Sequence, residues 1–342
     1  MIVDCAASLA AVGGTGSPAA LQRLPSSPAT VDDRFVADLW LACGAAGPAW
    51  RVDPAAAGPL PGPGWRALLV TATVGTSPFA ALRDLTAAGA KLPGPVACLT
   101  LGGAGLEGQH GRRWHAAPGN LHLSAALPCD LDAARCGPSL PMLAGVALAE
   151  AVEARAGTPA AGRHAPGLTW VNDLVVGGDA DGWRKLGGVL TAMRTSGARV
   201  TTVFVGVGLN LVVAPPLPEE PFALAAAALA DVIAPPDAAA APSLGAAALA
   251  VLSRLRVRLD ELAAHGPTSL VESYRARSIV VGREVEVWDA SVRAGARGTG
   301  LPPPRRRGVV VEILPDLGLV LEGQDEPVRD GCLRLGRRAG NP

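Results

Sequence analysis

Lysine is almost absent from this sequence. Only Lys91 and Lys185 are present, and the other 28 of the 30 basic residues are arginines. Arginine does not replace lysine where a site needs a compact, mobile ammonium group. A chain that uses arginine for nearly every other cation has nevertheless kept lysine at two positions. Chance explains either lysine alone as readily as function does, but the residues around Lys185 favour function there.

Net charge, paired cysteines and long apolar runs are also lacking. The 30 acidic residues balance the basic ones, so the whole chain offers no electrostatic attraction for nucleic acid or a membrane surface. The six cysteines contain no CxxC pair and follow no secretory signal, which favours reduced thiols. The longest apolar run, Phe222 to Ala234, is broken by Asp231 and is too short to span a bilayer. We therefore expect a soluble, cytoplasmic protein.

The composition changes along the chain and predicts three regions. Residues 1–64 are rich in alanine, proline and glycine, which is typical of an N-terminal extension and linker, although 33–43 fits one short amphipathic helix. Residues 65–277 carry strand and helix patterns and predict a catalytic domain. Short strands separated by turns follow from residue 279 and predict a small β-barrel over 278–338, in which 293–307 is an exposed insertion.

The central region predicts an α+β fold. Several of its expected strands follow one another without an intervening helix, which favours antiparallel pairing over a doubly wound sheet. We therefore expect a mixed, largely antiparallel sheet with flanking helices. The expected strands are 67–72, 96–101, 121–127, 168–176, 185–194 and 201–211; the expected helices are 78–88, 139–156 and 244–265, with a partly helical excursion over 214–242.

One nucleotide-binding pattern is misleading. Gly103, Gly105 and Gly108 match G-x-G-x-x-G after an expected strand. A dinucleotide site needs a helix to begin there, so that its amides meet the pyrophosphate. The sequence continues instead into a loop with no helical pattern and no βαβ unit, so we reject a dinucleotide-binding fold.

A loop that can close over an anion follows this pattern. Arg112 and Arg113 can neutralise carboxylate or phosphate oxygens, and Trp114 offers a flat apolar surface. A solvated basic turn beside a core tryptophan is the alternative for this segment alone.

Two further segments suggest phosphoryl chemistry. Asn172 and Asp173 end the sequence Thr-Trp-Val-Asn-Asp, and Lys185 opens an apolar strand beside Gly187 and Gly188. Glycines allow a ligand to approach the backbone, and an ammonium group can stabilise charge on a phosphoryl oxygen. Together with a carboxylate for Mg²⁺, this set is reasonable for nucleotidyl transfer. A third segment, Gly-Val-Gly-Leu-Asn over 206–210, is either a buried strand end or a nucleotide contact.

These segments together resemble the biotin–protein ligases, which share a catalytic fold with lipoate ligases and octanoyltransferases. The chain contains Arg-Arg-Trp-His-Ala-Ala-Pro-Gly-Asn-Leu-His-Leu-Ser, Thr-Trp-Val-Asn-Asp-Leu, Lys-Leu-Gly-Gly-Val-Leu and Gly-Val-Gly-Leu-Asn, in the family's order. The resemblance covers about 67–275, and the C-terminal strands resemble the SH3-like barrel found in many such ligases.

The resemblance implies a two-step reaction with biotin and ATP as substrates and Mg²⁺ as cofactor. Biotinyl-5'-AMP forms first, and the biotinyl group then passes to a lysine of the carboxyl-carrier domain of a carboxylase. Lys185 would stabilise the reacting carboxylate and α-phosphate, and Asp173 would serve the metal or the incoming amine. The residues that the family pattern assigns to substrate or nucleotide are Thr76, Ser77, Gln109, Gly111, Arg112, Arg113, Trp114, Gly119, Asn120, Trp170, Asn172, Gly187, Gly188, Gly206, Gly208 and Asn210.

The sequence departs from the family pattern in the arginine loop. Two arginines of the family fall at Glu107 and Gln109 when the sequences are aligned on Trp114, and Thr169 and Val171 replace a lysine and a proline. Three interpretations therefore stay open: a biotin ligase, a lipoate or octanoate ligase or transferase of the same fold, and a catalytically weak homologue that binds a ligand or partner. Either a monomer or a homodimer is compatible with the sequence.

Overall fold

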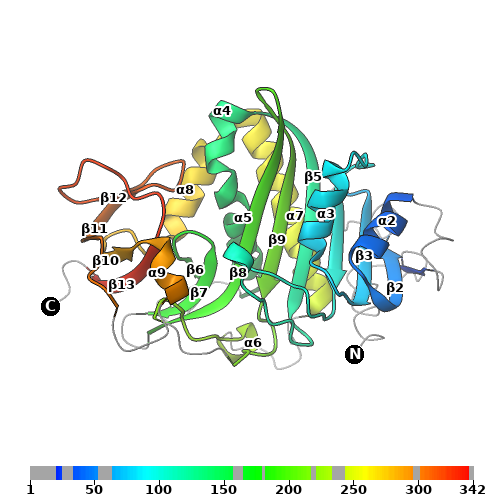
Figure 1. The fold of residues 1–342 in the computed structure, drawn as a ribbon, viewed down its shortest axis with the longest axis horizontal. Coiled ribbons are helices and arrows are strands. Elements are labelled where there is room, and N and C mark those ends of the chain that lie inside the picture. The colour runs from blue at the N-terminus through cyan, green and yellow to red at the C-terminus, as the bar shows by residue number, and fades with distance from the viewer. Residues whose placement is uncertain are drawn as a thin grey trace.

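The large domain is built on one nine-stranded sheet (Figure 1). The computed structural model describes residues 21–24, 34–52, 64–156, 165–178, 182–216, 221–232, 243–295 and 301–338. The strands of this sheet are β1 (Leu21–Arg23), β2 (Ala46–Val52), β3 (Ala67–Thr73), β4 (Val96–Thr100), β5 (Leu121–Asp132), β6 (Gly167–Leu168), β7 (Asp173–Gly178), β8 (Gly182–Ser196) and β9 (Arg199–Leu209). Their order across the sheet is β1-β2-β3-β4-β5-β9-β8-β7-β6.

Only β3 and β4 pair in parallel, because helix α3 (Pro78–Ala87) makes the crossover between them. All other neighbouring strands are antiparallel. The mixed, largely antiparallel sheet predicted from the sequence is therefore confirmed.

Helices cover both faces of the sheet (Figure 1). On one side α5 (Leu140–Ala156) and α7 (Leu244–His265) pack against the central strands, and α8 (Thr268–Arg277) packs on α5. On the other side lie α3 and α2 (Arg34–Ala42). Side chains along β3 alternate between the two faces of the sheet. Leu68 and Val70 lie in the core under α5, and Ala67 and Leu69 lie in the core under α2. No helix among the described residues is both long and apolar enough to cross a membrane.

The structure differs from the predicted N-terminal extension over 1–64. The short helix expected over 33–43 is present as α2, but β1 and β2 extend the sheet rather than forming a linker. Gly47 and Pro48 make β2 look like a loop in the sequence. The register of β2 against β3 shifts between Ala46 and Ala49, so these two residues interrupt no regular pairing.

The rest of that predicted extension, residues 1–20, 25–33 and 53–63, lies outside the described part of the chain.

Two further differences concern the central domain. Helix α8 was not expected from the sequence, and the extended stretch 168–176 is divided between β6 and β7 by a turn. The shorter helices are α4 (Ala133–Cys136), α6 (Leu229–Val232) and α9 (Ala290–Gly295), the last at the start of the expected insertion.

A small four-stranded sheet follows the central domain, as expected. Its strands are β10 (Arg283–Trp288), β11 (Arg306–Ile313), β12 (Leu319–Leu321) and β13 (Cys332–Arg338), in the order β12-β11-β10-β13. All three pairs are antiparallel. Val285, Val310 and Ile313 of this sheet belong to the same apolar core as α5 and α8. The small sheet is therefore packed onto the large domain.

Candidate active site

A cavity of about 360 Å³ lies where the conspicuous sequence segments converge. Its walls come from the loop before β5, from the turn before β7, from β8 and β9, and from the segment before α6. The predicted site residues that line it are Ser77, Gln109, Arg112, Arg113, Trp114, Asn172, Asp173, Lys185, Gly188, Gly206, Gly208 and Asn210.

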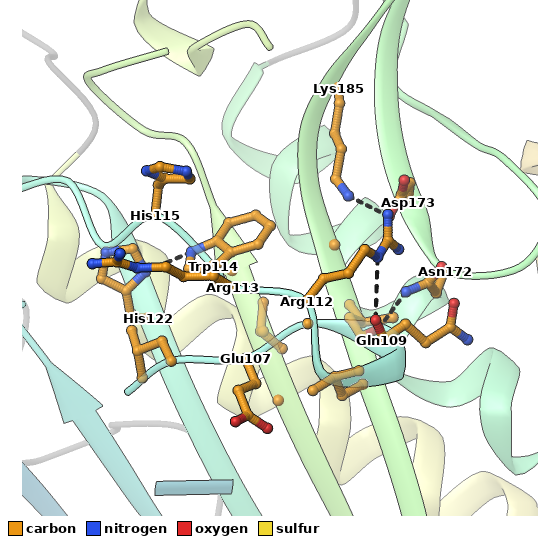
Figure 2. Close-up of a pocket in the computed structure, with 18 of the residues that line it drawn as sticks. Glu107, Gln109, Arg112, Arg113, Trp114, His115, His122, Asn172, Asp173 and Lys185 are labelled. Carbon is orange, nitrogen blue, oxygen red and sulfur yellow. Dashed lines mark hydrogen bonds and ion pairs between the residues drawn. The ribbon is translucent and has the colours of Figure 1, made fainter. Parts of the chain in front are cut away.

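An ion pair between Lys185 and Asp173 marks one wall of the cavity. The two side chains point toward one another (Figure 2), and Lys185 Nζ lies 2.7 Å from Asp173 Oδ1. They are 18% and 24% exposed, so the pair is shielded yet reachable from the cavity. The register of β7 against β8 places Asp173 opposite Gly188. A Cβ at Gly188 would lie 3.0 Å from Asp173 Oδ1 and 3.3 Å from Lys185 Nζ, so a larger residue would crowd the pair.

The indole ring of Trp114 is the second group that contacts the ammonium of Lys185. Lys185 Nζ lies 5.6 Å from the centroid of the Trp114 ring, within the range of a cation–π contact. The indole rests on bare backbone, because a Cβ at Gly208 would lie 2.4 Å from Trp114 Cζ2. The second glycine of the Gly-Val-Gly pattern is therefore needed to make room for Trp114, and not only for a ligand.

His122 holds the indole in this position. Trp114 Nε1 donates to His122 Nδ1 over 3.1 Å, and His122 Nε2 lies 3.4 Å from the carbonyl oxygen of Ala117. Burial lowers the pKa of His122 to about 4, so the ring is neutral near neutral pH. Nε2 then carries the proton, and Nδ1 is free to accept from the indole.

Three predicted asparagines shape the backbone around the cavity. Asn172 Nδ2 donates to Val189 O over 2.8 Å, which ties the turn before β7 to β8. Asn210 Nδ2 donates to Ala227 O over 3.1 Å, and Asn120 Nδ2 lies 3.4 Å from Asn210 Oδ1. Asn120 is fully buried behind the cavity and fastens the chain after β9 rather than facing the cavity.

The remaining predicted site residues do not line the cavity. Thr76 is exposed, whereas the adjacent Ser77 is buried in the cavity wall. The indole of Trp170 donates to Leu317 O over 2.6 Å and so points to the small sheet. Gly187 packs on the backbone of β9, since its Cβ would lie 2.5 Å from Gly208 O. Gly111 and Gly119 have positive φ angles of 70° and 88°, in the turns on either side of Trp114.

The loop that departs from the family pattern is closed on itself. Gly108 N donates to Arg112 O over 2.6 Å, and Arg112 Nε donates to Gln109 O over 3.2 Å. Glu107 pairs with Arg113 through its backbone, is exposed, and points away from Lys185 and Asp173 (Figure 2).

The glycines of the rejected dinucleotide pattern serve packing. A Cβ at Gly103 would lie 2.5 Å from Val74 O, and a Cβ at Gly105 would lie 2.2 Å from Gly75 O. Only a three-residue 3-10 helix, Gln109–Gly111, follows them. The loop therefore lacks the helix whose N-terminal amides a dinucleotide site would need.

Sequence reasoning missed several residues of the cavity wall. Strand β5 contributes His122 and Ser124, which pair with Gly208 and Gly206 across β5 and β9. Their alternation with Leu121 and Leu123 was the available signal. The others are Phe79, Thr100, Leu106, Gly108, His115, Leu123, Val189, Leu190, Val207, Pro215, Phe222, Ala223, Leu224 and Ala226; Glu107, which the sequence had singled out, also lines the cavity. Pro215, Phe222, Ala223, Leu224 and Ala226 come from the excursion over 214–242, whose backbone pairs with Lys185.

Comparison with known sequences matches the region that carries these segments to a known family. Residues 98–210 match the model of the biotin/lipoate A/B protein ligase family. The chain is 32% identical over 106 residues to the bifunctional ligase/repressor BirA of Bacillus spizizenii, and 31% identical over 106 residues to that of Bacillus subtilis. Each alignment covers 31% of this chain and 29% of the relative, so the chain matches less than a third of these curated proteins. The family resemblance drawn from the four segments is confirmed.

Comparison with solved structures supports the fold. The biotin protein ligase from Aquifex aeolicus in complex with biotin and ATP is similar with a TM-score of 0.53 at 19% identity, over 79% of this chain and 98% of that chain. A biotin protein ligase-like protein of unknown function from Silicibacter sp. TM1040 is similar with a TM-score of 0.51 at 14% identity, over 75% and 91%.

Proposed function

We propose that this chain, whose residues 98–210 match the biotin/lipoate A/B protein ligase family, is an ATP-dependent biotin–protein ligase of the cytoplasm. It would form biotinyl-5'-AMP and transfer the biotinyl group to a lysine of the carboxyl-carrier domain of a carboxylase. The observation that carries the proposal is the ammonium group of Lys185, held between Asp173 and Trp114 at the wall of a cavity.

The first step needs a cation where negative charge gathers. An oxygen of the biotin carboxylate attacks the α-phosphorus of ATP, the bond from that phosphorus to the β-phosphate bridging oxygen breaks, and pyrophosphate leaves. Lys185 would neutralise charge on the carboxylate and the α-phosphate as they approach each other. Asp173 keeps the ammonium group in place until then, since its carboxylate lies 2.7 Å from Nζ.

The second step breaks the mixed anhydride. The amine of the carrier lysine attacks the acyl carbon, an amide bond forms, and AMP leaves with the bonding electron pair. The amine must lose a proton in this step, and Asp173 is the carboxylate of the cavity wall beside Lys185. The loop with Arg112 and Trp114 would cover the anhydride and exclude water, which otherwise hydrolyses it.

The acid would occupy the part of the cavity between the sheet and α3. Phe79, Leu106 and Leu190 offer apolar contacts there, and the hydroxyls of Ser77, Thr100 and Ser124 offer hydrogen bonds. Such a wall suits a ring that carries polar groups better than a simple alkyl chain. It supports biotin over octanoate as the substrate.

The residues present do not fit a resident magnesium ion. Among the described residues, no group of three or more His, Cys, Asp or Glu side chains is arranged to hold a metal ion. Asp173 is a single carboxylate and is already paired with Lys185. Mg²⁺ usually reaches such sites on the phosphates of the nucleotide, with one or two carboxylates completing its shell. We therefore assign no step to a protein-bound metal.

The position of Glu107 bears on the alternative of a catalytically weak homologue. A carboxylate beside an anionic adenylate would be costly if it were buried, but exposed charges interact weakly. Glu107 lines the cavity, but its side chain is exposed and points away from the Lys185–Asp173 pair (Figure 2). Its presence is therefore compatible with the proposed chemistry.

Transfer of radiolabelled biotin to a purified carboxyl-carrier domain tests the proposal. Label should appear on the carrier only when ATP and the enzyme are both present, and unlabelled biotin should compete. Parallel reactions with lipoate and octanoate test the related ligases. Transfer of either acid in place of biotin would reassign the substrate. The absence of transfer with all three acids would favour a binding protein.

A further inference from the structure

A buried tyrosine lies directly behind the turn that carries Asp173. Tyr274, in α8, is the only tyrosine of the sequence and is fully buried. Its hydroxyl lies 3.2 Å from the carbonyl oxygen of Thr169 and 3.0 Å from that of Val171. It does not line the cavity, so it reaches the site only through this turn.

Besides the contacts with Tyr274, backbone and side-chain hydrogen bonds hold the turn between β6 and β7. Thr169 N donates to Asp173 O over 2.9 Å, which closes the turn. Val189 N donates to Asn172 O over 2.9 Å, and Asn172 Nδ2 returns a bond to Val189 O over 2.8 Å. These bonds tie the exit of the turn to β8. The Tyr274 hydroxyl holds its entry and middle, together with the indole of Trp170, which donates to Leu317 O.

Helix α8 is a rigid base for this hydroxyl. Arg277 pairs with Glu153 of α5 through two hydrogen bonds of 2.8 Å each. Arg275 Nε donates to Ile313 O of the small sheet over 2.7 Å. A displacement of the turn is therefore not readily followed by a displacement of Tyr274.

We propose that Tyr274 is a positioning residue for Asp173: its hydroxyl fixes the turn so that the carboxylate meets the ammonium group of Lys185. The catalytic part of this inference rests on the proposed function. Without the hydroxyl, two backbone carbonyls lose this donor, and the turn can relax toward the cavity. A displacement of about 1 Å in a reacting constellation can lower a rate by about a hundredfold. We expect kcat to fall by about ten- to a hundredfold in Tyr274→Phe, with the KM for biotin little changed.

The two lysines of the chain provide a test that needs no substrate. A limiting amount of an acylating reagent is added to the full chain, and mass spectrometry gives the ratio of modified Lys185 to modified Lys91. Lys91 is exposed and serves as the internal standard, whereas Lys185 is 18% exposed and held by Asp173. The ratio should be low in the unmodified sequence and should rise severalfold in Tyr274→Phe. Asp173→Asn, which breaks the pair directly, sets the upper limit of the ratio.

Arg275→Met is the matched control for loosening α8. It removes contacts one residue away on the same helix, with Ile313 O and Glu312, but none to the turn. Its labelling ratio and kcat should stay close to those of the unmodified sequence, because Arg277 still fastens α8 to Glu153 of α5. All proteins are labelled well below the Tm measured for the least stable of them, so that each is folded during the reaction.

The outcomes separate the two proposals. A ratio in Tyr274→Phe equal to that of Arg275→Met would overturn the positioning role, whatever the enzyme activity. A raised ratio in a protein that never transfers biotin would support the positioning role and overturn the ligase. An unchanged kcat together with a raised ratio would show that the pair is held by Tyr274 but not used in the reaction, which overturns the catalytic part of the inference.

Discussion

The indole of Trp114 occupies the space that a side chain at position 208 would fill. A Cβ on Gly208 would lie 2.4 Å from Trp114 Cζ2 and 2.5 Å from Cε2, well inside van der Waals contact. The same ring lies 5.6 Å from the ammonium group of Lys185. One glycine of β9 therefore sets the place of a side chain in the arginine loop, and through it the surroundings of the lysine.

Gly208→Ala should displace this indole. The added methyl group overpacks a tight, partly buried contact, and overpacking in a core typically costs about 1–3 kcal/mol of folding free energy. We expect adenylate formation to fall by roughly tenfold or more, because the ring no longer covers the lysine. Gly178→Ala is the control, since a Cβ there meets nothing within 4 Å. Equal activity and equal unfolding free energy in the two variants would contradict this account of Gly208.

His122 should make stability depend on pH in the acid range. The unfolded state binds a proton below the ordinary histidine pKa of 6.5, but the folded state does so only near 4. The unfolding free energy that depends on this titration is highest above pH 6.5, declines as the pH falls from 6.5 to about 4, and changes no further below pH 4. The loss is on the order of 3 kcal/mol. Urea unfolding across this pH range measures it, with His122→Asn as the variant that lacks this titration.

The hydrogen bond that His122 Nδ1 accepts from Trp114 should also contribute to stability at neutral pH. His122→Leu leaves the partly buried indole N–H of Trp114 without this acceptor and should cost about 1 kcal/mol or more of unfolding free energy. His122→Asn can place an amide oxygen near the former Nδ1 and should recover part of that loss. Equal destabilisation in both variants would show that ring packing, not the hydrogen bond, is what matters.

The single tyrosine makes an alkaline titration specific to one site. Burial, and secondly the negative charge of Asp173, raise the pKa of the Tyr274 hydroxyl far above its usual value of 10. The folded chain keeps the phenolic proton when the unfolded chain would lose it, so stability falls as the pH rises past 10. Tyrosinate absorbance should therefore appear only together with alkaline unfolding. A reversible titration near 10 in the folded protein would place this side chain in contact with solvent.

Removal of α2 and β2 should destabilise the large domain. Phe35, Leu39 and Trp40 of α2 share an apolar core with Leu69 of β3 and Leu82 of α3. Burial of each large apolar side chain contributes about 1.5–3 kcal/mol. Deletion of residues 1–63 should therefore lower the unfolding free energy by several kcal/mol, and deletion of 1–33, which keeps α2 and β2, by much less. Full stability after the longer deletion would restore the linker interpretation.

Residue patterns predicted most of the central domain, because its strands and helices have clear periodicity. Helix α7 spans the expected residues 244–265, and the four family segments meet at one cavity. The pattern did not reveal β2, since Gly47 and Pro48 lie at a register shift where pairing is not needed. A composition rich in glycine, proline and alanine does not distinguish a linker from a segment that pairs with a neighbouring strand, as β2 pairs with β3.

Contacts that depend on strand register were not predictable from the sequence. His122 faces Trp114 because β5 pairs with β9 in the register that places it opposite Gly208. Tyr274 lies 105 residues from Thr169 and 103 from Val171 in the sequence, and no short motif joins it to their turn. The family pattern assigned Asn120 and Trp170 to ligand, whereas their side chains bond to Val213 O and Leu317 O.

Biotin-dependent exchange of pyrophosphate into ATP tests the role of Lys185 most directly. Lys185→Ala should lower exchange by at least about a hundredfold with the fold intact, because the ammonium group at the cavity wall is lost. Lys91→Ala, which removes the other lysine of the chain, should exchange at the normal rate. Near-normal exchange in Lys185→Ala would contradict the central claim that this ammonium group stabilises the reacting carboxylate and phosphate.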